Sequence, residues 1–422
     1  MIFYLLIVSP IGFYLFFRVL LPLYWCINWI YNNSSSSYVD IVLFHVLYLF
    51  IDATLILILL RYIIKKTYKY RIFIYINHFK IRQKKYITLG IFIAFSLIIW
   101  LFFNYNSLPI FLNKGSDSIV LLAEKFKIKI WISFNLLKVL LILLMFIVVL
   151  INNYRIKILY LIILFLFYIS SGKKSALISA LLNCTFLYFL LRKIKINIKL
   201  LIFILLGTFT AVLFGVIQYQ RTILGYVNIN ELFQNFTNIF ILGIKIFYIS
   251  STVYLEQFIN LEGIKYAENY SQSLGNLGIF KYFLNPFLKF FFGTGIDKAI
   301  GPYLNYLIYG SNFPNGVNPT LFFEIIFIFG SKYACFFSFP ILILLFLFQR
   351  NAINKVLVYT IKGNIFFAAF WYLVFIWIFS FKVDTLNSIR NLPFMFLLPV
   401  TYKIIKILKN IANRRVKVER TI

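Results

Sequence analysis

Acidic residues, cysteine and histidine are all scarce in this sequence. Its 422 residues include 12 Asp and Glu against 42 Lys and Arg, with only 3 Cys and 2 His. Cys184 and Cys335 lie in apolar stretches, so the disulfide framework of a small secreted protein is not implied. The two histidines, His45 and His78, show no metal-ligand spacing, and we expect neither a metal site nor a cofactor.

Apolar side chains are abundant instead. They make up 62% of the chain, whereas soluble globular proteins contain about 45 to 50%. Runs of about 20 apolar residues, the length that crosses a bilayer as a helix, recur from end to end. Backbone groups in lipid must be satisfied within each segment, and the alternation of barrel strands is missing. We therefore predict an all-α, polytopic membrane protein with about ten (10–12) transmembrane helices.

Charges of opposite sign fall in alternate connecting segments. Residues 61–85 hold nine Lys or Arg and no acid. Nine acids fall in the other set of connections: Asp40, Asp117, Glu124, Glu231, Glu256, Glu262, Glu268, Asp297 and Asp384. Basic connections remain cytoplasmic during insertion, so this pattern orients the helices. The net charge of +30 is then explained by orientation and by contact with anionic lipid, and we expect no nucleic-acid partner.

The same pattern divides the chain into four regions. Residues 1–217 form an N-terminal bundle of about seven helices, and residues 218–320 form a large extracytoplasmic loop with interfacial helices. Residues 321–408 supply about three more helices, and residues 409–422 form a basic cytoplasmic tail, so that both termini are cytoplasmic. The expected spans are residues 2–25, 39–60, 87–103, 130–151, 158–170, 175–191, 200–217, 321–348, 364–381 and 392–408. Residues 236–253 either lie in the interface or dip into the membrane.

Cations on the outer side oppose the orienting rule and so require an explanation. Lys173 and Lys174 follow Gly172 at a helix–helix turn. Helix N–H groups and two ammonium groups together would suit a diphosphate, whereas the simpler alternative is two lysines snorkelling to the headgroups. Arg221 follows the seventh expected span and could hold phosphate oxygens in bidentate fashion, or serve as an interfacial anchor. Arg390, in a short outer loop with Asp384, is a further acid–base candidate.

Two carboxylates fall inside expected spans. Glu324 lies four residues into the span that starts at residue 321. A carboxylate within a bilayer costs about 2 to 3 kcal/mol or more, so it usually faces a cavity and has a function. Glu324 could act as a general base or pair with an outer cation, and a structural ion pair with Lys332 is the alternative. Asp52 is similar, and pairing with Arg18 would account for it.

Three local patterns, together with the topology, carry a family resemblance. They are SSGKKSAL at residues 170–177, YFLNP at 282–286, and NPTLFFE at 318–324 followed by FG at 329–330. With a large outer loop in the second half, the chain resembles the oligosaccharide repeat-unit polymerases of bacterial inner membranes, the Wzy-type O-antigen polymerases. Lys173 and Lys174 stand where that family more often has Arg, which keeps the charge but loses the planar fork.

The resemblance implies a metal-independent membrane glycosyltransferase. It would polymerise undecaprenyl-diphosphate-linked oligosaccharide repeat units into O-antigen or a related surface polysaccharide, at the outer face of the bacterial inner membrane. A flippase and a chain-length regulator of the same pathway are the implied partners. The implied catalytic residues are Glu324, Arg221 and Asp384; the diphosphate-binding residues are Lys173, Lys174, Arg221 and Arg390; and the sugar-binding residues are Tyr282, Asn318 and Thr320.

Two other functions remain open. A lipid-linked oligosaccharide flippase or another transporter would also use cations in a cavity, but transporters usually show internal repeats and short loops. An O-antigen ligase is the other alternative. That family is expected to have a histidine in its outer loop, and both histidines here lie outside residues 218–320.

Overall fold

The computed structural model describes residues 9–34, 36–76, 82–104, 129–170, 174–192, 260–275, 278, 280–284, 300–309, 319–383 and 385–419. All regular elements in these ranges are helical, with no strand among them. The N-terminal elements are α2 (Pro10–Tyr14), η1 (Leu15–Leu20), α3 (Leu21–Asn32), α4 (Val39–Ile74), α5 (Gln83–Asn104), α7 (Lys129–Leu150), α8 (Tyr154–Ser170) and α9 (Lys174–Leu191). The C-terminal elements are η4 (Ile264–Tyr266), α14 (Ala267–Leu274), α16 (Ile300–Tyr309), α17 (Leu321–Phe329), η5 (Lys332–Phe337), α18 (Ser338–Ile361), α19 (Ile365–Val383) and α20 (Thr385–Glu419).

Five of these helical stretches are long and apolar enough to cross a membrane: Pro10–Asn32, Val39–Ile74, Gln83–Phe103, Lys332–Ile361 and Ile365–Val383. Their outward faces are apolar as well. On α4, Leu43, Leu47 and Phe50 are exposed, while Leu49 and Ile56 are buried. Large apolar side chains exposed in rows are the surface expected to meet lipid. By helix length and hydropathy, the chain is therefore a multi-pass helical membrane protein, as the sequence predicts.

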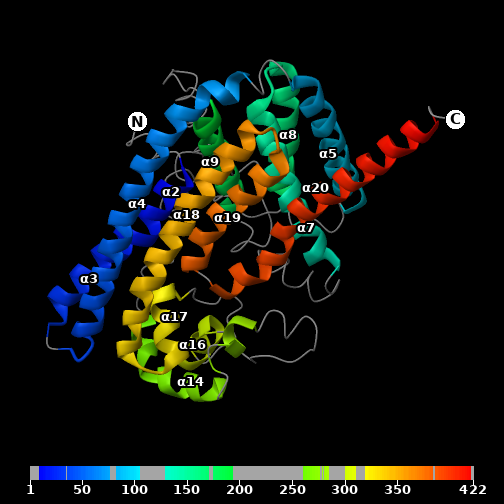
Figure 1. The fold of residues 1–422 in the computed structure, drawn as a ribbon. Coiled ribbons are helices and arrows are strands. Elements are labelled where there is room, and N and C mark those ends of the chain that lie inside the picture. The colour runs from blue at the N-terminus through cyan, green and yellow to red at the C-terminus, as the bar shows by residue number, and fades with distance from the viewer. Residues whose placement is uncertain are drawn as a thin grey trace, which may run out of the picture.

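The long helices pack into one bundle with a smaller group of helices at one end (Figure 1). Helix α18 packs between α4 and α19, and α19 packs against α20. Helices α14, α16 and α17 lie together at the lower end in Figure 1, and α20 leaves the bundle toward the C-terminus. Buried side chains from both halves of the sequence form one continuous core, in which Phe146 of α7 contacts Tyr372 of α19.

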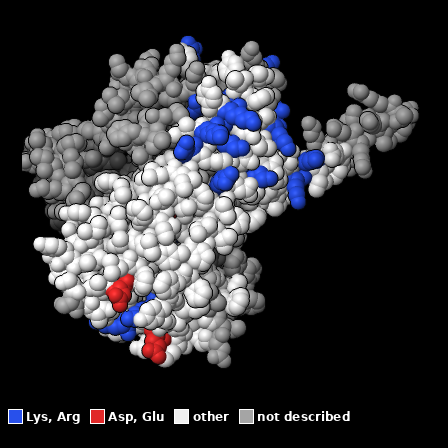
Figure 2. Space-filling model, turned by 60° about the vertical axis from the view of Figure 1, so that its left-hand side comes forward, with Lys and Arg blue, Asp and Glu red and all other residues white. Residues whose placement is uncertain are grey.

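Charge is segregated along the long axis of the molecule. Figure 2 shows most Lys and Arg of this face gathered at one end, and Asp and Glu at the other end beside a smaller basic group, with uncharged surface between the two ends. At the basic end, Arg82 donates to the carbonyl oxygen of Lys362 at 3.1 Å, and the N–H of Asn152 donates to Gln83 at 2.8 Å. At the acidic end, Glu262 pairs with Lys265 at 3.7 Å. Connections predicted to share the cytoplasmic side are thus brought together at one end.

One predicted span is wrong. Residues 321–348 were expected to cross as a single helix, but Gly330 adopts a left-handed conformation (φ 69°) and ends α17 after nine residues. Helix α17 is therefore about 13 Å long, too short for a hydrocarbon layer of about 30 Å. The membrane-crossing stretch begins at Lys332 and continues to Ile361. Helix α17 is instead packed inside the protein, with residues 321–328 all buried.

Helices also extend beyond the boundaries that the sequence predicts. Helix α4 continues through the basic segment to Ile74, and the expected outer loop at residues 382–391 is mostly helix, because α19 ends at Val383 and α20 begins at Thr385. Charged side chains do not interrupt a helix once it has left the apolar layer, so a hydropathy boundary underestimates helix length. The seventh span lies outside the described residues, as do residues 218–259, 276–277, 279, 285–299 and 310–318 of the predicted outer loop.

Candidate functional site: two buried carboxylates

The first carboxylate, Asp52, is brought into the protein by the buried face of α4. His45, Tyr48 and Asp52 recur at three- and four-residue intervals, so all three side chains lie on one face of the helix. The apolar residues Leu49 and Ile56 share that face and are buried. Burial of this apolar stripe forces Asp52 out of contact with water, and none of its surface is exposed.

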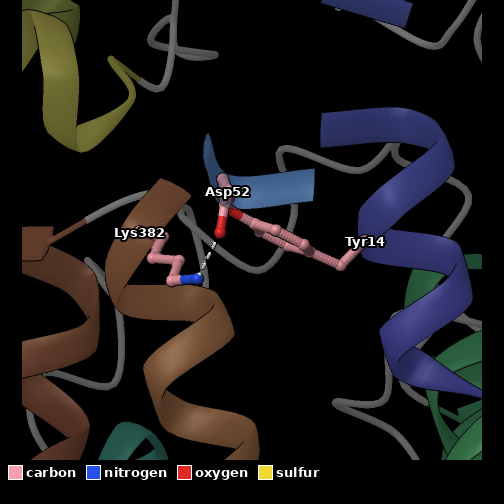
Figure 3. Close-up of polar contacts among 3 residues, drawn as sticks. All are labelled: Tyr14, Asp52 and Lys382. Carbon is pink, nitrogen blue, oxygen red and sulfur yellow. Dashed lines mark hydrogen bonds and ion pairs between the residues drawn. The ribbon is translucent and has the colours of Figure 1, made fainter. Parts of the chain in front are cut away.

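Asp52 has a partner for each of its oxygens (Figure 3). Lys382 Nζ, in the last turn of α19, lies 2.7 Å from Oδ1, and the Tyr14 hydroxyl at the end of α2 donates to Oδ2 at 2.8 Å. Lys382 is 2% exposed, and its Nζ also lies 5.4 Å from the centroid of the Tyr14 ring. Helices α2, α4 and α19 therefore meet at one hydrogen-bonded ion pair, in which the two opposite charges offset each other.

The cation beside Asp52 is Lys382 rather than Arg18, the partner that the sequence suggested. Arg18 lies in η1, a π-helical stretch that begins directly after Tyr14. Pro22 lacks an N–H and so cannot donate to the carbonyl of Arg18, which favours irregular winding here. Tyr14, one turn before Arg18, supplies the contact to Asp52 instead.

The second carboxylate, Glu324, lies in the first turn of α17 and is 2% exposed. The Tyr282 hydroxyl donates to Glu324 Oε1 at 3.0 Å, and Tyr282 is itself buried. A helix N-terminus carries partial positive charge, which stabilises a carboxylate in the first turn. Tyr282 belongs to the predicted extracytoplasmic loop, so this bond joins the loop to α17, which packs against α14 at one end of the bundle.

Two further polar groups surround Glu324. Thr320 is the residue before α17 and is buried, and its Oγ1 has no hydrogen-bond partner within the part of the chain that the structure describes. Tyr270 of α14 is near enough to interact electrostatically with Glu324. Burial, with a smaller contribution from the Glu324 carboxylate, raises the pKa of Tyr270 well above its usual value. Tyr270 therefore remains a neutral hydroxyl at any physiological pH.

Tyr48 connects the two carboxylates. It lies within electrostatic range of both Asp52 and Glu324. Its ring lies 5.5 Å from Phe322 in α17, and the His45 ring lies 4.7 Å from the same phenylalanine. Tyr48 Oη and His45 Nε2 are buried, and within the described ranges neither has a hydrogen-bond partner. A line of polar side chains thus runs along α4 from the ion pair to the first turn of α17.

Three of the site residues predicted from the sequence are described here together: Glu324, Tyr282 and Thr320. The hydrogen bond joins the first two, and Thr320 precedes the helix that carries Glu324. The roles assigned to them remain predictions. Tyr282 is buried, so neighbouring residues cover its ring. Its hydroxyl donates to Glu324. The structural alternative for Glu324 is not formed, because Lys332, also a described residue, directs its Nζ to the Tyr333 ring at 5.1 Å.

The other predicted site residues cannot be compared with the structure in the same way. Lys173, Arg221, Asn318 and Asp384 lie outside the described residues. Lys174 begins α9 and Arg390 lies within α20, but the described positions do not extend to their side chains.

Sequence reasoning missed Lys382 and Tyr14. Lys382 was assigned to the start of an outer loop, although it directly continues the apolar run 364–381. A cation at that position opposes the orienting rule as strongly as those at residues 173, 174 and 221. That signal, matched against the acid inside the second span, could have suggested the pair. Nothing in the sequence singled out Tyr14 among 30 tyrosines.

Comparison with known proteins adds no relative: no family model, no curated protein sequence and no solved structure matches this chain.

Proposed function

We propose that this protein is a membrane glycosyltransferase that polymerises undecaprenyl-diphosphate-linked oligosaccharide repeat units at the outer face of the bacterial inner membrane. The observation that carries this proposal is the buried Glu324 carboxylate, held by Tyr282 where the described part of the outer loop packs on α17. A carboxylate kept from water beside a membrane-embedded helix suits a general base for a sugar hydroxyl.

In the proposed reaction, a hydroxyl of the acceptor's terminal sugar attacks the anomeric carbon of the donor glycan. Glu324 accepts the hydroxyl proton, and the bond between the anomeric carbon and the diphosphate oxygen breaks. Undecaprenyl diphosphate leaves with the bonding electron pair, and its charge is offset by Arg221, Lys173, Lys174 and Arg390. Helix α9 begins at Lys174, at the end opposite to Arg192, and a helix N-terminus favours a phosphate group. Asp384 is a second candidate base.

We further propose ten membrane spans with both termini cytoplasmic. Seven spans precede residue 218 and three follow residue 320, and residues 409–422 form the cytoplasmic tail. On the face drawn in Figure 2, most basic side chains gather at the end opposite to the acidic ones, which supports this orientation. Helix α20 extends to Glu419, so the tail continues the last span.

Gene deletion tests the proposal most directly. Cells without a polymerase still export and attach a single repeat, so the polymer ladder on a gel collapses to one band. Complementation with Arg221→Ala or Glu324→Gln should also give only the single repeat, whereas Glu268→Gln should restore the ladder. Glu268 is a matched control, because it is an exposed carboxylate of α14 in the same outer segment. A normal ladder with Glu324→Gln would remove Glu324 from the mechanism. Unattached polymer after deletion would indicate a ligase.

Transport of a lipid-linked oligosaccharide is the second candidate, and the Asp52–Lys382 pair favours it. Paired ionisable groups within membrane helices often mark ion-coupled or substrate pathways in transporters. The two candidates separate in the deletion strain, because loss of a flippase abolishes even the single attached repeat.

A further inference from the structure

A cavity of about 440 Å³ lies at the basic end of the molecule, remote from Glu324. Arg71 and Tyr75 line it from the end of α4, and Tyr188 and Arg192 line it from the end of α9. Asn152, in the connection between α7 and α8, completes the wall. Three predicted cytoplasmic connections therefore contribute to one hollow.

The two guanidinium groups are fixed in place by backbone carbonyls. Arg192 donates from Nε to the carbonyl oxygen of Val149 and from Nη2 to that of Ile151, both at 2.6 Å. It thereby satisfies carbonyl groups at the buried C-terminal end of α7. Arg71 donates from Nη2 to the carbonyl oxygen of Phe189 at 2.8 Å. Its Nε is buried and, among the described residues, has no hydrogen-bond partner.

A third cation stands beside these two. Lys157 of α8 places its Nζ 5.8 Å from the centroid of the Tyr188 ring, and the Arg192 guanidinium lies 5.7 Å from the same ring. Burial, together with repulsion from Arg192, lowers the pKa of Lys157 to about 8. Burial is the larger cause of this lower pKa, and the like charge of Arg192 adds to it.

The sequence segments that carry the cluster contain no carboxylate. Residues 53–116 and 125–230 contain no Asp or Glu, so neither the helices that line the cavity nor their flanking connections supply one. Carbonyl oxygens solvate a guanidinium but leave its charge in place. Two guanidinium groups in the cavity wall, with Lys157 close to the Tyr188 ring, therefore create a positive potential that an anion would offset.

We propose that this cavity binds a phosphate-bearing anion, supplied in the cell by the headgroup of an anionic phospholipid. Arginine forks are suited to bidentate phosphate binding, and basic pockets between membrane helices on the cytoplasmic side hold such headgroups. Ile72 and Tyr75, at the rim, are exposed. An aliphatic and an aromatic side chain beside the cations suit the boundary between acyl chains and headgroups. This site is independent of the glycosyl transfer proposed above.

The test uses the purified full-length protein in detergent, titrated with phosphatidylglycerol, phosphatidylcholine or inorganic phosphate while thermal unfolding is followed. Phosphatidylglycerol should raise the unfolding temperature and phosphatidylcholine should not. In Arg71→Gln, the apparent affinity for phosphatidylglycerol should be about tenfold weaker, as expected for loss of one charge-assisted hydrogen bond. Lys157→Gln should weaken it in the same direction, without altering the contacts that Arg71 makes.

Lys69→Gln is the matched control, because Lys69 is an exposed cation of α4 outside the cavity. Equal weakening by Lys69→Gln would indicate diffuse charge attraction and overturn the site, as would equal stabilisation by phosphatidylcholine. Stabilisation by inorganic phosphate at millimolar concentration, lost in Arg71→Gln, would support the phosphate site and assign it to a free anion. Stabilisation by phosphatidylglycerol alone supports the lipid headgroup.

Discussion

Lys382 Nζ lies 2.7 Å from Asp52 Oδ1, although 330 positions separate the two residues in the sequence. The contact joins α19 to α4, and Tyr14 adds α2 through a hydrogen bond to the other carboxylate oxygen (Figure 3). All three groups are buried. The pair therefore specifies how the C-terminal helices dock on the N-terminal ones.

Lys382→Met should lower the free energy of unfolding by about 3 to 5 kcal/mol, because it leaves the buried Asp52 carboxylate without its cation. The double variant Asp52→Leu/Lys382→Met should recover most of that loss, since two apolar side chains pack together without a desolvation cost. Unfolding of the purified variants in detergent measures both. Equal instability of the single and double variants would show that the charge is not the cause.

Tyr282→Phe should lower the free energy of unfolding by about 1 to 3 kcal/mol, because it removes the hydrogen bond to the buried Glu324 but keeps the ring. Tyr333→Phe is the control, because Tyr333 is exposed. It should unfold like the unchanged protein in the same assay. A Tyr282→Phe variant as stable as Tyr333→Phe would mean that the hydroxyl does not hold Glu324.

Substitutions at three glycines distinguish the cost of backbone strain from the cost of a steric clash. Gly330 ends α17, whereas Gly275 and Gly278 follow α14. A Cβ on Gly330 would lie 2.8 Å from Ser271 Cβ, at a φ of +69°. Gly275 has the same φ but nothing within 4 Å, and Gly278 has neither constraint. Substitution by Ala should therefore destabilise the protein most at Gly330, where both constraints apply. At Gly275 the cost should be about 1 to 2 kcal/mol, from the left-handed conformation alone. The cost should be smallest at Gly278. Unfolding temperatures in detergent would test this order.

Phosphatidylglycerol binding at the basic cavity should weaken as pH rises above about 8. Lys157 has a pKa of about 8 without ligand, and a bound anion raises that pKa because it stabilises the ammonium. Affinity is then full below pH 8 and declines as pH rises toward the higher pKa of the complex. Arg192, the residue directly after α9, is the charged group that interacts with Lys157, and both cations lie close to the Tyr188 ring. Titrations at pH 7 and pH 9 should differ for the unchanged protein and agree for Lys157→Gln.

Topology can be tested with single cysteines, since Cys26, Cys184 and Cys335 are buried. An impermeant maleimide added to intact spheroplasts should label Gln272→Cys in α14 and leave Lys69→Cys in α4 unlabelled. Both positions are exposed, so accessibility alone does not distinguish them. Labelling of Lys69→Cys only would invert the proposed orientation.

The sequence predicted the membrane class well because that signal is local and additive. Helices α7, α8 and α9 begin and end within a few residues of the expected spans, since hydropathy and charged flanks are read directly from neighbouring residues. The break at Gly330 was missed because hydropathy averaged over residues 321–348 is high, although Gly330, Ser331 and Lys332 interrupt the apolar run. Gly330 is the left-handed C-cap of α17, and α14 packs against the same end of the helix, where Ser271 donates to the carbonyl oxygen of Ile328.

The candidate site likewise has residues that the sequence predicted and contacts that it did not. Glu324, Thr320 and Tyr282 stood out because an acid in an apolar run is conspicuous and because local patterns of the resembled family include all three. Asp52 pairs with Lys382 rather than with Arg18 because of how far α2, α4 and α19 are shifted along one another. No single segment of the sequence determines that shift. The cavity at Arg71 and Arg192 likewise arises only when the ends of α4 and α9 meet.

The Asp52 contacts also impose an order on biogenesis. Tyr14 precedes Asp52 during synthesis, so their hydrogen bond can form as soon as the second helix enters the bilayer. Lys382 follows 330 residues later, a delay of about 20 to 60 s at typical elongation rates. For that interval the nascent chain carries an acid in its second helix with a phenol as its only native partner. Until α19 arrives, the insertion machinery must therefore accommodate a second helix whose carboxylate lacks its cation.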